Sequence, residues 1–140
     1  MSLRVTHLGL WVHDQDDALA WYTGKLGFEV REDVTLPEFG DYRWLTVGPP
    51  GQPDIAFILN VPGPPLFDPA TAEAVLGMVA QGAMGGGMIG CDDCQATYDE
   101  LVGRGVEFSQ PPTQQPYGID AQLRDLSGNQ FRLVQRTDGG

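Results

Sequence analysis

An internal repeat constrains the fold of this chain more than any other feature. Residues 5–34 predict a strand, a helix and a second strand, because apolar side chains alternate, then recur at helical spacing, then alternate again. Residues 88–108 repeat this order, and Gly27-Phe-Glu-Val30 returns almost unchanged as Gly105-Val-Glu-Phe108. Because each copy fills about half of the chain, the repeat indicates two similar modules.

The first copy carries clear signals for the ends of its helix. Asp14 is a candidate N-cap, since its carboxylate can accept a hydrogen bond from the first helical turn. Gly27 is well placed to end the helix. In the preceding strand, the period of two places His7, Gly9 and Trp11 on one face and the apolar residues between them on the other.

The remaining chain completes two units of the order β-α-β-β-β. Strands are expected at 42–47 and 54–61 in the first half, and at 106–110, 118–125 and 130–136 in the second. Residues 36–41 and 111–116 are expected to be loops because of their proline and glycine content. Residues 70–81 predict a short helix between the halves.

These elements predict an α+β fold in which two βαβββ modules form a curled mixed sheet around a cleft. The expected boundaries are 1–61 for the first module, 62–86 for a connector or lid, and 87–140 for the second module, within one structural domain. Long segments without regular structure often serve a function, so the connector is a candidate cover for a binding site.

Composition excludes some partners. The 140 residues have a hydrophobic fraction of 41%, enough for a core, and a formal net charge of −11. This charge argues against nucleic acid and anionic membrane surfaces and permits a cationic ligand. No apolar stretch approaches a membrane span and no signal peptide is evident, so we expect a cytoplasmic protein. Cys91 and Cys94 have a redox-motif spacing, but the acidic residues between them oppose a thiolate and favour a packing role.

The segments T-H-L-G-L-W-V, A-L-A-W-Y-T-G-K-L-G-F-E-V, C-D-D-C-Q-A-T-Y-D-E-L-V-G-R-G-V-E-F and D-L-S-G-N-Q-F-R-L-V resemble the vicinal oxygen chelate superfamily. This group holds glyoxalase I, bleomycin-resistance proteins and extradiol dioxygenases. The resemblance implies the glyoxalase/bleomycin-resistance fold and a homodimer. It does not by itself specify a function.

Enzymes of this superfamily hold a divalent metal with four side chains. The resemblance places these positions at His7, near Ile58, near Gly86 and at Arg132, and only His7 has a suitable side chain. Glycine and isoleucine have no donor atom in the side chain, and arginine stays protonated. We therefore expect no metal, no cofactor and no catalytic residue.

A cleft without a metal would suit a flat apolar ligand held by stacking and a few polar contacts. The candidate ligand-binding residues are His7, Trp11, Phe39, Tyr42, Trp44, Ile58, Asn60, Met88, Tyr117, Gln122 and Arg132.

The expected function is metal-independent binding of a small aromatic or cationic molecule, such as a drug, antibiotic or natural product, by sequestration. Two alternatives stay open. One is a metal-dependent lyase, isomerase or dioxygenase of the same superfamily. The other is an interaction module whose cleft binds nothing small.

Overall fold

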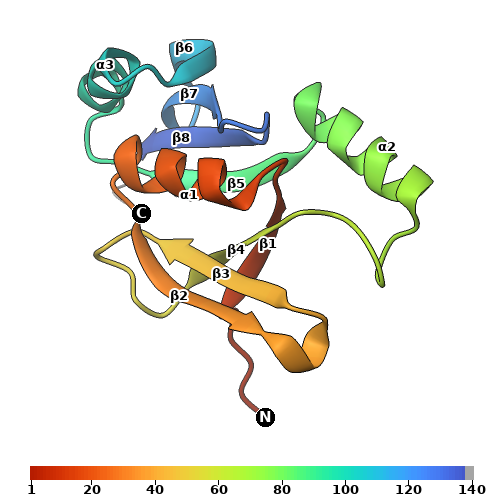
Figure 1. Ribbon diagram of the computed structural model, residues 1–140. Coiled ribbons are helices and arrows are strands. Elements are labelled where there is room, and N and C mark those ends of the chain that lie inside the picture. Colours follow the sequence, from red (N-terminus) through yellow and green to blue (C-terminus); the bar gives the residue numbers. More distant parts are fainter. Residues whose placement is uncertain (138–140) are drawn as a thin grey trace. The chain divides into compact units, whose positions relative to one another are not determined.

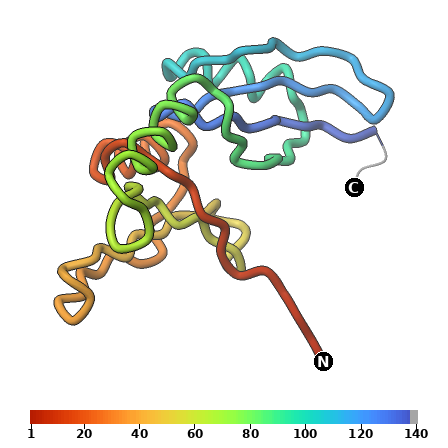
Figure 2. The backbone as a smooth tube through the Cα atoms, turned by 90° about the vertical axis from the view of Figure 1, so that its right-hand side faces the viewer, coloured from red at the N-terminus to blue at the C-terminus, as the bar shows by residue number. Residues whose placement is uncertain are grey.

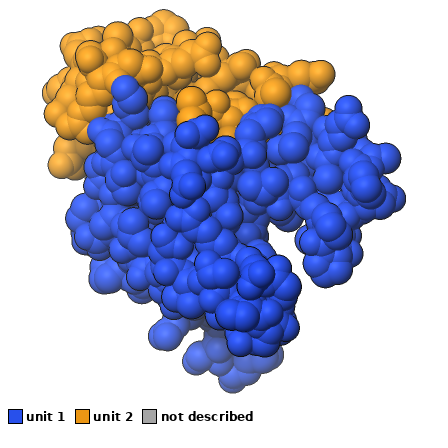
Figure 3. All heavy atoms as spheres, viewed as in Figure 1, with its two compact units in different colours: residues 1–77 blue, residues 78–140 orange. Residues whose placement is uncertain are grey.

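The computed structural model describes residues 1–137, which fall into two compact units, the first ending at Gly77 and the second beginning at Met78 (Figures 1 and 3). Unit 1 contains β1 (His7–Trp11), α1 (Gln15–Gly24), β2 (Glu29–Leu36), the short 3-10 helix η1 (Pro37–Phe39), β3 (Tyr42–Gly48) and β4 (Ala56–Asn60). Helix α2 (Pro69–Ala80) spans the boundary between the units. Unit 2 contains β5 (Gly85–Gly90), α3 (Cys94–Gly103), β6 (Glu107–Gln115), β7 (Gly118–Arg124) and β8 (Gln130–Arg136).

Each unit contains one four-stranded mixed sheet. The strand order is β1-β4-β3-β2 in unit 1 and β5-β8-β7-β6 in unit 2. In each sheet the first strand pairs with the last in parallel, and the other neighbours are antiparallel. Figure 2 shows β7 and β8 of unit 2 running side by side. The topology confirms the expected α+β class and the repeated βαβββ order.

The core of unit 1 lies between α1 and one face of its sheet. Trp21 and Tyr22 of the helix are buried, as are Leu45 of β3 and Leu59 of β4. Burying side chains of this size provides the main stabilisation, at about 1.5–3 kcal/mol each. We call the opposite face of the sheet, which carries the half-buried Trp44, Ile58 and Asn60, the open face.

Charged and capping contacts fix α1 on the sheet. Asp14 is the N-cap, as the sequence predicts, and its carboxylate accepts a hydrogen bond from Asp17 N at 2.8 Å. Arg43 of β3 contacts both Asp16 of α1, at 2.7 Å, and Asp33 of β2, at 2.9 Å. The hydrogen bond from Arg43 is the main cause that holds the pKa of Asp33 below its usual range. These contacts connect α1 and β2 to β3.

Unit 2 is built in the same way around α3. Asp93 is its N-cap and accepts a hydrogen bond from Ala96 N at 3.0 Å. Leu101 of the helix packs on the face of the sheet that buries Leu123, Phe131 and Leu133. The opposite face of this sheet carries a different, largely polar set of side chains.

Strand β6 differs from the sequence-based expectation. It runs from Glu107 to Gln115 and includes Pro111 and Pro112, which were expected to lie in a loop. β6 is an edge strand, where a residue without an N–H can face away from its neighbour. The pairing with β7 also shifts between Phe108 and Thr113, which accommodates the prolines.

Smaller differences concern the ends of elements. Helix α1 ends at Gly24, and Gly27, with φ +70, makes the turn that leads into β2. Part of the expected loop 36–41 is the 3-10 helix η1. Within the described residues, no helix is long and apolar enough to cross a membrane.

Candidate binding site on the open sheet faces

Six of the predicted ligand-binding residues share the open face of the unit 1 sheet: His7, Trp11, Tyr42, Trp44, Ile58 and Asn60. The parallel register places Trp11 beside Asn60 and Gly9 beside Ile58. Because side chains alternate along each strand, these residues lie opposite the buried Leu45 and Leu59. The face assignments made from the period of two are consistent with this arrangement.

Direct contacts connect several of these side chains. The rings of His7 and Trp44 lie 5.4 Å apart, and His7 Nδ1 is 2.9 Å from the Thr6 hydroxyl. Trp44 Nε1 donates to a carboxylate oxygen of Glu32 at 3.1 Å. The Tyr42 hydroxyl donates to Asn60 Oδ1 at 2.7 Å. These bonds orient the aromatic rings while leaving their faces partly exposed.

Two aromatic residues have different surroundings. The Trp11 ring lies 5.1 Å from the ring of Phe67, a residue that the sequence analysis did not select. Phe39 is 69% exposed and belongs to η1, outside the strands of the open face. The structure therefore groups Trp11 with the connector segment and does not bring Phe39 to the other candidates.

The open face of unit 2 is organised by a buried carboxylate, Asp120 of β7, which is 0% exposed. It accepts hydrogen bonds from the Tyr117 hydroxyl and from Arg132 Nη1, both at 2.5 Å. Gln110 and Gln115 donate to the same carboxylate at 2.9 Å and 3.3 Å. Four donors satisfy this buried charge, as a charge removed from water requires.

The network shifts the ionisation of its members. Burial by itself raises the pKa of Asp120, but the hydrogen bonds from Tyr117, Arg132, Gln110 and Gln115 together lower it below its usual range. The hydrogen bond to Asp120 raises the pKa of Tyr117 and is the main cause that raises the pKa of Arg132. The arrangement therefore holds a carboxylate and a guanidinium as a neutral pair, with Arg132 34% exposed at the surface of the sheet.

Asp120 is the residue that the sequence analysis missed. Its spacing of two from Gln122 puts both on one face of β7, and this alternation was the available signal. Gln122 lies beside Arg132 in the register and 3.4 Å from the Ser109 hydroxyl. The predicted residues Tyr117, Gln122 and Arg132 thus belong to one polar surface.

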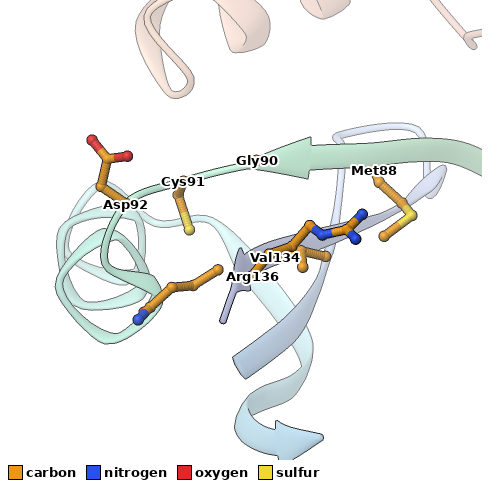
Figure 4. Close-up of a pocket in the computed structure, with 7 residues that line it drawn as sticks. Met88, Gly90, Cys91, Asp92, Val134 and Arg136 are labelled. Atoms are coloured by element: carbon orange, nitrogen blue, oxygen red, sulfur yellow. The ribbon is translucent and has the colours of Figure 1, made fainter. Parts of the chain in front are cut away.

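A pocket of about 590 Å³ lies on unit 2 at the end of β5 and β8 (Figure 4). It is lined by Met88, Gly90, Cys91, Asp92, Val134, Gln135 and Arg136. Met88, the one predicted residue among them, is 64% exposed. In Figure 4 the Asp92 carboxylate points away from the other lining side chains.

A smaller pocket of about 200 Å³ lies on unit 1, lined by Thr6, His7, Arg31, Glu32, Pro53, Asp54, Ile55 and Ala56. The Arg31 guanidinium donates to the carbonyl oxygens of Pro49 and Gln52, at 2.6 Å and 3.0 Å. These bonds tie Arg31 to the loop before β4. Its role is therefore structural.

The cysteine pair is packed at the start of α3. Cys94 is fully buried, and Cys91 is half-buried at the edge of the larger pocket. Burial raises the pKa of Cys91, and it raises that of Cys94 to about 11. Thiols with raised pKa values are poor nucleophiles and poor metal ligands at neutral pH. This favours the packing role over redox chemistry.

The residues at the family's four metal positions do not fit a metal ion. Arg132 is bonded to Asp120, and a Cβ at Gly86 would lie 2.4 Å from the buried Phe131 ring, so this position cannot carry a donor side chain. Ile58 has no donor atom. Among residues 1–137, no group of three or more His, Cys, Asp or Glu is placed to hold a metal. His7 alone does not make a site of three or four ligands.

Comparison with known proteins decides the family. Residues 4–133 match the model of the Glyoxalase/Bleomycin resistance protein/Dioxygenase superfamily. The chain belongs to this superfamily. Its glyoxalase-like fold, expected from the sequence motifs, is thereby confirmed. Among the curated members, the uncharacterized protein YurT of Bacillus subtilis (strain 168) is 33% identical over 134 residues, which cover 96% of this chain and 100% of YurT.

Two solved structures are similar to this chain over nearly its whole length. UcmS2 has a TM-score of 0.90 and 43% identity, and the match covers 96% of this chain and 99% of UcmS2. TnmS3, an antibiotic binding protein from Streptomyces sp. CB03234, has a TM-score of 0.74 and 28% identity, with 97% of this chain and 98% of TnmS3 covered. Similarity of this extent supports a shared fold, whereas function is argued from the site.

Proposed function

We propose that this chain binds a small organic molecule, a drug or natural product, and acts by sequestering it without a metal ion. One observation carries the proposal: residues that cannot ligate a metal stand where the family's metal ligands are expected. Side chains that cannot ligate a metal occupy three of the four positions, while Trp44, Tyr42 and His7 line the open face of unit 1. Aromatic faces and a few oriented polar groups are typical of sites that bind by affinity.

Similarity to TnmS3 adds support, because that protein is described as antibiotic binding. The strong match to UcmS2 places the chain close to proteins of the same size and fold. We also propose that the protein is a cytoplasmic homodimer. The dimer is what the resemblance to the superfamily implies. Sedimentation at several concentrations tests the dimer, and a monomer at all of them would contradict it.

The substitution Trp44→Ala tests the binding function. We expect the affinity for aromatic ligands to fall by about tenfold, because a stacking surface is lost. The fold should survive, since the Trp44 side chain lies on the open face and not in the core. The measurement is a fluorescence or calorimetric titration with ligands selected by thermal shift from a panel of aromatic natural products.

Trp21→Phe is the matched control, since Trp21 belongs to α1, is 8% exposed and lies in the core on the other side of the sheet. It should lower stability and leave affinity unchanged. If Trp44→Ala binds as tightly as the unmodified protein, Trp44 is not in the site. If no member of the panel shifts the melting temperature, the proposed binding function is wrong.

A further inference from the structure

The two modules of the chain can be compared residue by residue at the end of their first strands. The N-caps Asp14 and Asp93 hold equivalent positions, so Trp11 in β1 corresponds to Gly90 in β5. The strand pairing agrees, because Trp11 lies beside Asn60 and Gly90 lies beside Val134 in parallel registers.

Equivalent backbone hydrogen bonds support this correspondence. Val12 N donates to the carbonyl oxygen of Asn60 at 2.8 Å, and Cys91 N donates to that of Val134 at 2.9 Å. Each bond joins the residue after the last strand position to the neighbouring parallel strand. The comparison is therefore one of structure as well as of sequence order.

The two positions differ in what covers the sheet. In unit 1 the Trp11 ring covers its end of the open face and contacts the Phe67 ring. In unit 2, Gly90 has no side chain, and a Cβ built there would meet nothing within 4 Å. The pocket of about 590 Å³ lies over this glycine. The pocket thus lies at the position where the first module carries its indole.

The walls of this pocket fit an aromatic ring. Val134 provides an apolar floor beside Gly90, and the Met88 thioether and the Arg136 guanidinium also line the pocket (Figure 4). Thioether sulfur and guanidinium groups both contact aromatic rings favourably. The guanidinium can also donate a hydrogen bond to an oxygen of the ligand.

We propose that the pocket over Gly90 receives a flat aromatic ring of the ligand, and that this ring carries a hydrogen-bond acceptor oxygen. The ring occupies the position in unit 2 that is equivalent to the position of the Trp11 indole in unit 1. This inference rests on the proposed binding function and names the class of ligand and the residue that admits it. Gly90 sets the specificity, because any large side chain there fills the space that the ring needs.

Substitutions of increasing size at position 90 test the inference. Binding of the probe 2-naphthol is measured from the amide chemical shifts of the isotope-labelled full-length protein. Gly90→Ala adds only a Cβ, which meets no protein atom, and should weaken binding of 2-naphthol less than any larger side chain at this position. Gly90→Trp should weaken binding by at least about tenfold, because its indole occupies the pocket. Gly90→Leu is a second filling variant in case the tryptophan variant fails to fold, and it should weaken binding in the same direction.

Gly103→Trp is the matched control. Gly103 ends α3, and a Cβ there also meets nothing within 4 Å, so this variant adds the same side chain to unit 2 away from the pocket. Its affinity for 2-naphthol should be unchanged. Decahydro-2-naphthol, which keeps the hydroxyl and loses the flat ring, should bind about threefold to tenfold more weakly than 2-naphthol.

The outcomes separate the inference from the proposed function. The inference is supported if 2-naphthol changes the amide chemical shifts of residues 90 and 134 in the unmodified protein and does not change them in Gly90→Trp and Gly90→Leu. Shifts confined to the face around Trp44, with unchanged affinity in both filling variants, overturn it and leave the binding function standing. Equal affinity for the saturated analogue also overturns it. The absence of shifts with 2-naphthol and with every ligand of the natural-product panel overturns both.

Discussion

At the scale of single residues, Asp120 shows how this fold accommodates a charge on its open face. The carboxylate is fully buried, and four side-chain donors surround it, including Arg132 and Tyr117. A buried charge is tolerated when it is paired and hydrogen-bonded, and leaving one partner alone is costly. Asp120 therefore orients Arg132 and determines how much of its charge a ligand meets.

Replacing this carboxylate gives a prediction about stability. Asp120→Asn should lower the free energy of unfolding by about 2 kcal/mol at pH 7, because charge-assisted hydrogen bonds to Arg132 are lost. The folded pKa of Asp120 is lowered, so its contribution is present at neutral pH and is lost as the pH falls below about 4. Denaturant unfolding at pH 7 and pH 3 measures both effects.

The difference between the unmodified protein and Asp120→Asn should therefore shrink at pH 3. Glu73→Gln, on the exposed surface of α2, is the control and should change stability little at either pH. A difference that stays constant between pH 7 and pH 3 would contradict the role assigned to the Asp120 charge.

At the scale of elements, β5 differs from its counterpart β1 because of its glycines. A Cβ at Gly86 would collide with the Phe131 ring, whereas one at Gly90 would meet no atom. The strand thus approaches the core closely at one end and leaves a pocket at the other. The same glycine-rich segment removes the metal ligand that the family carries here and admits the aromatic ring that we propose.

Substitutions along β5 test this description. Gly86→Ala should destabilise the protein by about 2 kcal/mol, since the buried Phe131 ring must move to make room. Gly90→Ala is the matched control and should leave the melting temperature unchanged or slightly raised. Thermal unfolding of the two variants gives the comparison. Equal melting temperatures would mean that the Phe131 contact does not constrain this strand.

Sequence patterns predicted the helices and strands more accurately than they predicted the contacts between side chains. The N-cap Asp14 and the faces of β1 and β3 follow from local spacing, and the structure agrees with them. The strand through Pro111 was missed because its tolerance of proline depends on its place at the sheet edge, which local sequence does not reveal. The Asp120 network and the pocket over Gly90 depend on register between distant strands, which is fixed only in the folded chain.

At the scale of the whole molecule, two copies of one supersecondary unit have been adapted differently. Unit 1 presents aromatic rings on its open face, and unit 2 presents a neutralised ion pair and a pocket. Both open faces carry side chains capable of stacking or hydrogen bonding, and the residues at the metal positions that the resemblance implies do not fit a metal. The superfamily fold is thus retained, while the residues at the implied metal positions differ from metal ligands.

Ligand affinity measured by calorimetry with and without a chelator tests the central claim most directly. Protein treated with EDTA and protein supplied with Zn²⁺, Ni²⁺, Mn²⁺ or Fe²⁺ should bind an aromatic ligand from the panel with the same affinity, and the ligand should be recovered unchanged. Affinity that disappears with EDTA and returns with one metal, or conversion of the ligand to a product, would contradict metal-independent sequestration and favour a metal-dependent enzyme.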